Sequence, residues 1–315
     1  MAGTFTHWMV VEKALNKFDE LPTKYPNFDK LLTNNHFVIL GAVGPDYPYL
    51  SEVLAAAVGI KEHSWADRMH YENTDDPVKY GATGLAKLSG DDFNICLSWL
   101  CGFTTHLLID SVIHPVVQAI VGPYIFNSGE HRKCEMVQDS MIFKEVKGIE
   151  LVYDDYFNLL KMCSDPSDQE RLHPAVSNLW TEVLKMSHPG GVAKFPDIQP
   201  DLWHKNFLEK IDIATHPSPI AIFRHVEESG DVVYRKTNEI PADEKEKYFT
   251  NINLPGSKKG DFITHAFNKA IDEVVDVWQK LLVDINNGDY KNCATYLRNW
   301  DLDTGVDQDS IFFWN

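Results

Sequence analysis

The stretch His106-Leu-Leu-Ile-Asp110-Ser-Val-Ile-His114 places three polar side chains inside a strongly apolar part of the chain. Each step between them is four residues, so on a helix His106, Asp110 and His114 lie on one face. The residues around them are apolar nearly all round the helix, which predicts that the helix is buried. A buried aspartate without a partner is costly, so Asp110 needs a metal ion, a cation or several hydrogen-bond donors.

A second pair of ligand-type residues follows on the next predicted helix. In His131-Arg-Lys-Cys-Glu135 the histidine and the carboxylate are again four residues apart. Alone, this pair would be typical of a solvated helix face. Beside the first three residues, we interpret all five as ligands of a buried site for several metal ions. Histidine nitrogen and carboxylate oxygen are the ligands that zinc prefers, together with thiolate.

Composition limits the class of protein. The chain has 315 residues, which is enough for a sizeable core, and a net charge of −17, which gives no basic footprint for nucleic acid. Bound zinc ions would add local positive charge, so a nucleic-acid substrate stays open but is not favoured. The five cysteines form no CxxC pair and predict free buried thiols in a reducing compartment: Cys96, Cys101, Cys134, Cys163 and Cys293.

The N-terminal residues show no basic segment followed by a long apolar run, so we expect no signal peptide and a cytoplasmic location. A secreted mature form remains an open alternative. The most apolar stretch, residues 95–126, carries His106, Asp110 and His114, a polar load that argues against a lipid-facing span. We therefore expect no transmembrane segment.

Helical periodicity dominates the chain and predicts one all-α domain over residues 1–315. Pro115 should kink its helix or mark a break, because its nitrogen cannot donate to the preceding turn. The tail from residue 296 to residue 315 is expected to be irregular. The predicted helices are 6–19, 27–40, 50–60, 78–88, 92–120, 130–146, 150–163, 167–187, 200–213, 216–228, 242–250 and 260–286.

Three further residues matter only in combination. His7 stands just before an apolar helix, Asp46 lies in a Gly-Pro-Asp-Tyr-Pro turn, and His70 lies in the segment 65–74. Each, taken alone, is better explained as a helix cap or a surface residue. With the five residues above, they form a pattern with a known counterpart.

The whole set resembles the zinc-dependent phospholipase C family, which shares its fold with the S1/P1 nucleases. The matching segments are, in chain order, Thr6-His7-Trp8, Gly41-Ala-Val-Gly-Pro-Asp46, Met69-His70-Tyr71, Gly102-x3-His106-x3-Asp110-x3-His114, His131-x3-Glu135 and Trp300-Asp-Leu-Asp-Thr-Gly305. The ligand motifs lie within residues 1–140. The resemblance implies a multi-helix bundle around a trinuclear zinc site.

The resemblance also implies how up to three zinc ions are held. The first would be bound by Asp46, His70, His106 and Asp110. The second would be bound by His114, His131, Glu135 and water. The third would be bound by His7, by Asp110 as a bridge, and by the amine and carbonyl of Ala2, which requires that Met1 is removed. The short gap from Asp110 to His114 is similar to the glycosylphosphatidylinositol-specific phospholipase D branch.

The activity that the resemblance implies is hydrolysis of a phospholipid or a related phosphodiester by metal-activated water. Asp46 and Asp110 would be the catalytic residues, with Asp46 as the base. Tyr47, Tyr49 and Tyr71 lie beside ligands, where they would either line the site for a lipid head group or simply pack.

Three alternatives stay open: a single-strand nuclease or 3′-nucleotidase on the same fold, a biosynthetic metalloenzyme with a non-phosphate substrate, and a non-catalytic protein stabilised by its metals. An HD-type phosphohydrolase is disfavoured because the sequence has no adjacent His-Asp pair. A ferritin-like di-iron site is disfavoured because only Glu170 and His173 have the required spacing.

Overall fold

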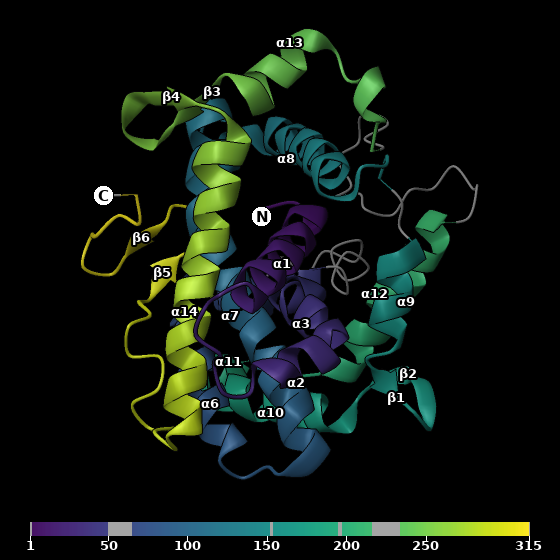
Figure 1. Cartoon of the computed structure of the whole chain (residues 1–315), viewed down its shortest axis with the longest axis vertical. Coiled ribbons are helices and arrows are strands. Elements are labelled where there is room, and N and C mark those ends of the chain that lie inside the picture. Colours follow the sequence, from purple (N-terminus) through teal and green to yellow (C-terminus); the bar gives the residue numbers. More distant parts are fainter. Residues whose placement is uncertain (1, 50–64, 152–153, 195–196, 216–233, 315) are drawn as a thin grey trace.

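The computed structural model describes residues 2–49, 65–151, 154–194, 197–215 and 234–314, and helices dominate it (Figure 1). The helices in the first half are α1 (Thr4–Asp19), α2 (Phe28–Thr33), α3 (Asn35–Gly41), α5 (Trp65–Tyr71), α6 (Asp76–Leu85), α7 (Gly90–Val121) and α8 (Tyr124–Lys147). Those in the second half are α9 (Asp154–Lys161), α10 (Pro174–Ser187), α11 (Pro189–Lys194), α12 (Pro200–Thr215), α13 (Ala242–Lys245) and α14 (Asn268–Asn286). The all-α prediction is confirmed.

The strands are short and form three separate antiparallel pairs among the described residues. They are β1 (Ser164–Asp165) with β2 (Asp168–Leu172), β3 (Ile252–Leu254) with β4 (Lys258–Gly260), and β5 (Trp300–Asp301) with β6 (Val306–Asp307). None is long enough to form a layer of the fold, so they act as turns between helices or, for β5 and β6, as a tail that contacts α7.

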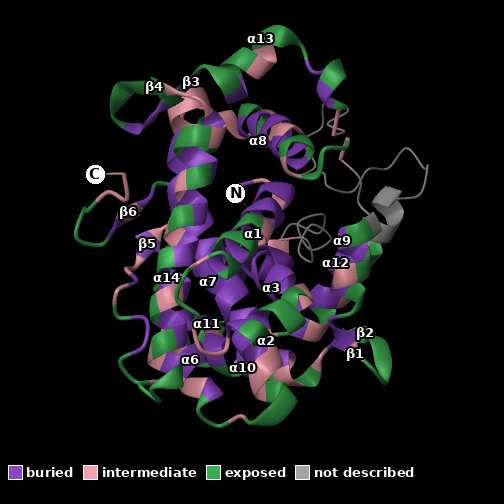
Figure 2. Cartoon of the chain, viewed as in Figure 1, coloured by how far each residue is buried: buried purple, intermediate pink, exposed green. Residues whose placement is uncertain are grey.

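Helix α7 is the centre of the bundle. It contacts α1, α3, α6, α8, α10 and α14, and in Figure 2 the buried colouring gathers on α7, α1 and α3 while the outer faces are exposed. Among the described residues α7 alone is long and apolar enough to span a membrane, yet 94% of its apolar window is buried inside the protein. Its apolar character is therefore explained by its central position.

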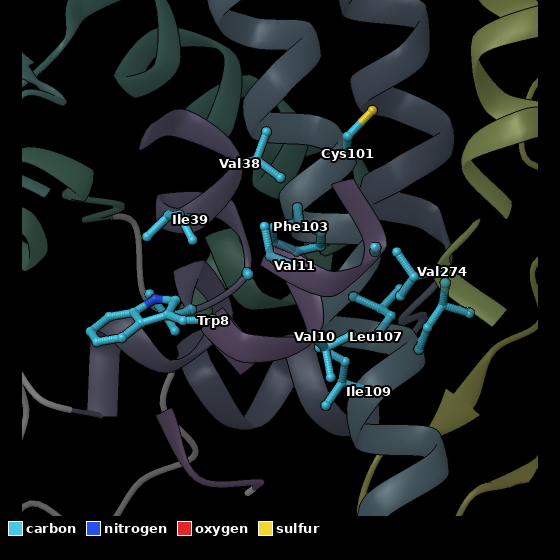
Figure 3. Close-up of a cluster of buried hydrophobic side chains, with 14 of the residues drawn as sticks. Trp8, Val10, Val11, Val38, Ile39, Cys101, Phe103, Leu107, Ile109 and Val274 are labelled. Carbon is cyan, nitrogen blue, oxygen red and sulfur yellow. The ribbon is translucent and has the colours of Figure 1, made fainter. Parts of the chain in front are cut away.

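Helices α3 and α7 approach each other closely at two glycines. A Cβ on Gly102 of α7 would lie 2.1 Å from the Val38 carbonyl oxygen, and one on Gly41 of α3 would lie 2.2 Å from the Trp99 carbonyl oxygen. Only glycine allows the two backbones to meet this closely. The residues around this crossing form part of the core shown in Figure 3, where α1, α3, α7 and α14 all contribute apolar side chains.

Several predicted elements differ from the observed ones. The helix predicted at 27–40 is two helices, because Asn34 leaves the helical region with φ −110° and ψ 34°. The helix predicted at 167–187 begins only at Pro174. The residues before it form the β1–β2 hairpin, in which the Asp165 carboxylate accepts from Ser167 and so stabilises the turn.

Other differences lie at helix ends and in the tail. The helix predicted at 130–146 begins earlier, at Tyr124, and the predicted segments 242–250 and 260–286 each contain a π-helical turn, Glu246–Thr250 and Ile263–Phe267. No break occurs at Pro115, since α7 runs on to Val121. The predicted helices 50–60 and 216–228 lie outside the described residues. Among the described residues, one continuous hydrophobic cluster runs from Ala2 to Leu302; a single domain over residues 1–315 stays a prediction.

Candidate metal centre

The predicted row of polar residues on α7 is confirmed. His106, Asp110 and His114 are each no more than 3% exposed and lie in the buried part of the helix. Because they recur every four residues, their side chains point to the same side. The helix therefore presents two imidazoles and a carboxylate to the space between α7 and the start of α1.

The Asp110 carboxylate lies at the centre of this site. Its fully buried oxygens are surrounded by nitrogen atoms of residues far apart in the sequence. These are His7 Nε2 at 3.2 Å, His106 Nε2 at 3.3 Å, His114 Nε2 at 3.4 Å, His70 Nε2 at 3.5 Å and the Ala2 backbone nitrogen at 3.2 Å. One carboxylate therefore connects four histidines from α1, α5 and α7.

Asp46 supplies a second carboxylate at the same place. It ends the short 3-10 turn Gly44–Asp46, and its Oδ1 lies 3.2 Å from His70 Nε2 and 3.9 Å from His106 Nε2. The two imidazole Nε2 atoms of His70 and His106 are themselves only 3.1 Å apart. Two ring nitrogens that approach this closely need a proton or a cation between them, because their lone pairs repel.

The second ring nitrogen of each of four histidines is held by an acceptor. Nδ1 of His106 lies 2.9 Å from the Ala42 carbonyl, Nδ1 of His70 lies 2.7 Å from the Ala66 carbonyl, Nδ1 of His114 lies 3.0 Å from Asp303 Oδ1, and Nε2 of His131 lies 2.6 Å from the Gly122 carbonyl. An N–H donated to such an acceptor leaves the other nitrogen with a free lone pair. This is the arrangement that orients histidines bound to a metal.

Unsatisfied buried atoms supply the test of whether a metal fits. Both ring nitrogens of His7, Oδ1 of Asp46, Oδ2 of Asp110 and Nε2 of His114 have no hydrogen-bond partner, although each is buried. Polar atoms left in this state cost about 1–3 kcal/mol each. Their donor types and their convergence match the N and O ligands of zinc, so the residues fit the metal.

Two groups of three ligand atoms, in which all atoms lie within 4.8 Å of one another, occur among the described residues. One is His70, His106 and Asp110, and the other is His7, Asp46 and His106. The second group joins His7 to residues that the resemblance gives to a different ion. His7 also stacks on the His106 ring, with centroids 4.5 Å apart. The first and third predicted positions therefore adjoin each other.

The mutual attraction of these groups alters their pKa values in the absence of metal. Burial alone raises the pKa of Asp110, but the charges of His114 and His106 outweigh it and lower that pKa well below its usual range. Burial likewise raises the pKa of Asp46, but His106 and His70 outweigh it, so that the pKa is lowered. For His70 burial is outweighed by the nearby carboxylates of Asp110 and Asp46, which raise its pKa to about 10. His7, by contrast, has a pKa lowered by burial and by His106.

The predicted ligands His131 and Glu135 lie on α8, next to His114. Both are buried, at 3% and 9% exposure. Burial lowers the pKa of His131 and the charge of His114 adds to that effect, while burial raises the pKa of Glu135 and His114 opposes it. Neither belongs to the two compact groups of three, so α8 contributes to the edge of the site that faces His114.

Ala2 lies beside Asp110 because the start of α1 is fixed in the core. The backbone nitrogens of Phe5 and Thr6 and the Thr6 hydroxyl donate to the buried Asp139 carboxylate of α8. These are backbone N–H groups at the start of a helix, which have no partner within the helix itself. Asp139 therefore anchors α1 so that Ala2, which is 3% exposed, is held at the site.

Asp303 is a site residue that the sequence analysis did not assign. It lies in the quoted Trp300–Gly305 motif, and its Oδ1 accepts from His114 while its Oδ2 accepts from Tyr71 at 2.9 Å. The Gln118 amide donates to its carbonyl. Burial would raise the pKa of Asp303, but the hydrogen bond with His114 lowers it. The motif could have indicated that this segment belongs to the site, but its spacing does not show which histidine Asp303 contacts.

The three tyrosines beside the ligands have different surroundings. Tyr47 is fully buried and stacks on Phe207 with centroids 4.5 Å apart, so it packs in the core. Tyr49 donates to Asp67, and its ring lies 5.4 Å from that of His70. Tyr71 is 41% exposed and next to Asp303. Of the three, Tyr71 is the one at the surface above the site.

Comparison with known proteins agrees with this geometry. A family model described as zinc-dependent phospholipase C matches residues 6–190, which is more than half of the chain and includes His7, Asp46, Asp110 and Glu135. Neither the curated proteins nor the solved structures gave a match. Asp303 lies outside the matched residues yet contacts His114 inside them. The match over more than half of its length shows that this chain belongs to the zinc-dependent phospholipase C family, and the buried His and Asp groups agree with it.

Proposed function

We propose that this protein hydrolyses a phospholipid or a related phosphodiester through water activated at its zinc site. Membership of the family supports a zinc-dependent hydrolase of this class. The observation that carries the proposal is the Asp110 carboxylate, which is fully buried and within 3.5 Å of four imidazole nitrogens. So many ligand-type atoms around one carboxylate favour several metal ions over a single structural one.

The proposed ligands follow the pattern of the resemblance. Asp46, His70, His106 and Asp110 would hold the first ion; His114, His131 and Glu135 the second; and His7, Asp110 and Ala2 the third. The Ala2 position depends on Met1 removal, which would turn the nitrogen that now lies 3.2 Å from Asp110 into a free amine. Mass spectrometry of the purified protein tests this step, since retained Met1 would exclude the third position.

When bound, zinc polarises phosphoryl oxygens and lowers the pKa of water, so that hydroxide is available near neutral pH. The protein's own residues hold the metal ligands in place and orient the reacting water. Asp110 is fully buried among His7, His70, His106 and His114, whereas Asp46, at 6% exposure, is less completely enclosed. We therefore assign the general base to Asp46 and the bridge to Asp110.

A lipid substrate is favoured over nucleic acid by charge. The chain carries a net charge of −17, which does not favour binding of a polyanion, whereas a single phosphodiester needs only the metal site. The short Asp110-to-His114 gap is similar to that of the glycosylphosphatidylinositol-specific phospholipase D branch, so head groups of that type belong among the substrates to be tested. Tyr71, exposed beside Asp303, is placed to contact a head group.

Metal analysis combined with a substrate panel tests the proposal. We expect at least two zinc ions per chain, and hydrolysis of short-chain phospholipids or glycosylphosphatidylinositol analogues that stops on chelation and returns with zinc. Cleavage of single-stranded nucleic acid without lipid hydrolysis would favour the nuclease alternative. Zinc binding without hydrolysis of any phosphodiester, with unfolding on chelation, would favour the non-catalytic alternative.

We also propose a cytoplasmic location. The five cysteines are free and buried, which supports a reducing compartment. Cell fractionation tests this, and recovery of the protein in an extracellular fraction would contradict it.

A further inference from the structure

The first turn of α8 carries the most exposed pair of large apolar side chains among the described residues. Ile125 is 80% and Phe126 is 81% exposed, and Tyr124 before them is 37% exposed. The other exposed apolar residues are less exposed and are not adjacent pairs, the next being Met162 at 60% and Ile149 at 53%. Large apolar groups that are this exposed and contiguous mark an interaction site. We call Pro123–Phe126 the apolar tip.

The backbone of the tip is fixed by hydrogen bonds and by particular dihedral angles. Gly122 has φ +88°, a conformation that favours glycine, and the Phe126 nitrogen donates to the Pro123 carbonyl at 3.2 Å. The Asn127 amide also donates to Pro123, and Asn127 itself leaves the helical region with φ −142°. The backbone therefore holds Ile125 and Phe126 outward before α8 continues.

The tip adjoins the metal centre through His131. The Gly122 carbonyl lies 2.6 Å from His131 Nε2, and the Tyr124 and His131 rings meet edge to face with centroids 5.4 Å apart. A surface bound by the tip would therefore lie next to the edge of the site that His131 and His114 form. This continuity distinguishes the tip from an apolar patch elsewhere on the molecule.

Charge and size indicate what kind of surface the tip fits. Residues 116–129 contain no acidic, basic or histidine side chain, in a chain of net charge −17. The adjacent Glu130 is paired with Lys247 at 2.9 Å. Such a region neither needs nor attracts an anionic surface. Three side chains are also far too few for a stable protein interface, which buries about 800 Å² per partner, whereas insertion into lipid needs only apolar side chains that reach the acyl boundary.

We propose that the apolar tip inserts into the surface of a zwitterionic lipid bilayer and so brings the metal centre against its substrate. This inference rests on the proposed function, because it takes the substrate to be a lipid in a membrane. Tyr124, an amphipathic ring at the base of the tip, is of the residue type enriched at the level of lipid head groups.

The test is binding of the zinc-loaded protein to vesicles made of a phosphonate analogue of phosphatidylcholine, in which a P–C bond replaces the scissile P–O bond. Ile125→Ser combined with Phe126→Ser should weaken vesicle binding about tenfold or more, since each buried apolar side chain contributes strongly to insertion. The matched control is Ile149→Ser combined with Met162→Ser, which also removes two exposed apolar residues. Ile149 follows the far end of α8, about 30 Å from the tip, and this control should bind vesicles as the unmodified protein does.

Hydrolysis of a monomeric short-chain phosphatidylcholine separates the two proposals. The tip variant should retain it, because no tip residue is assigned to the metal centre. If the unmodified protein hydrolysed no phosphodiester, the proposed function would be contradicted. Vesicle binding tests the membrane role separately, because it does not depend on hydrolysis. The membrane role would be overturned if the two variants bound vesicles equally, or if the unmodified protein bound no vesicles. It would also be overturned if the tip variant lost monomer hydrolysis as strongly as it lost vesicle binding, or if the protein formed a dimer that the tip variant dissociates.

Discussion

The Asp110 side chain contacts several histidines at once, so its replacement should affect more than one metal position. The carboxylate lies within 3.5 Å of His7, His70, His106 and His114. Asp110→Asn preserves shape but replaces one oxygen with a donor that cannot bind a metal or accept from imidazole. We expect the variant to lose more than one equivalent of zinc per chain and nearly all hydrolytic activity, measured by elemental analysis and phosphodiester turnover.

The control for this variant is Asp92→Asn, which removes the same charge from an exposed position in the first turn of the same helix. It should keep both metal content and activity. Full zinc content in the Asp110 variant would show that this carboxylate is not a bridging ligand.

Asp303 should act through His114 rather than on the metal itself. Its Oδ1 holds Nδ1 of His114 at 3.0 Å, which leaves Nε2 facing the site. Asp303→Asn should weaken zinc affinity about 10–100-fold, as is typical when the group that orients a ligand is lost. Competition with a chelator of known affinity measures this directly, without reference to turnover.

Asp309→Asn is the matched control, because the Asp309 side chain is 67% exposed and contacts Arg298 rather than His114. Zinc affinity should not change in that variant. An equal effect in both would mean that the C-terminal segment acts by general stabilisation and that Asp303 has no specific part in orienting His114.

At the level of elements, the site depends on how closely α3 approaches α7. The chain that leaves α3 supplies the Ala42 carbonyl, 2.9 Å from His106 Nδ1, and then Asp46. Both positions are fixed by the contact between Gly41 and Gly102, where an added Cβ has no space. Sequence periodicity predicted both helices, and the glycines stood in the quoted motifs, but only the structure reveals that they meet.

Gly102→Ala therefore should force the two helices apart. We expect the free energy of unfolding to fall by about 1–3 kcal/mol, the usual cost of overpacking, and zinc affinity to fall with it because Asp46 moves. Urea unfolding and chelator competition measure the two effects. Gly190→Ala, where an added Cβ meets nothing within 4 Å, should leave both unchanged.

At the scale of the whole molecule, buried histidines should make the fold sensitive to acid. His204 of α12 is fully buried against Ser164, and burial lowers its pKa from 6.5 to about 4. Between these two values the unfolded chain binds a proton that the folded protein does not. The stability linked to His204 is therefore complete above pH 6.5 and is lost as the pH falls toward 4.

This linkage amounts to about 2 kcal/mol between pH 7 and pH 5. His204→Gln should reduce the loss of unfolding free energy over that interval by a similar amount, measured by urea unfolding of the metal-loaded protein at both pH values. The control His265→Gln, at a histidine whose side chain is 43% exposed, should show the full loss. An unchanged pH dependence in the His204 variant would exclude His204 as its source.

Periodicity and residue chemistry predict the all-α class, the buried character of α7 and the five proposed ligands that lie four residues apart, whereas His7, Asp46 and His70 follow only from the family resemblance. Local periodicity did not determine where helices stop, as at Asn34 and in the β1–β2 hairpin, since side chain to backbone bonds such as those of Asp165 decide those ends.

Tertiary structure alone decided which side chains meet. Asp303 is 189 residues from His114 and Asp139 is 133 residues from Thr6, yet the first orients a histidine and the second anchors α1 beside Asp110. No periodic pattern connects residues that far apart, because their contact depends on how the helices pack and not on the repeat of one helix. The same holds for the apolar tip, since only the folded chain leaves Ile125 and Phe126 exposed next to His131.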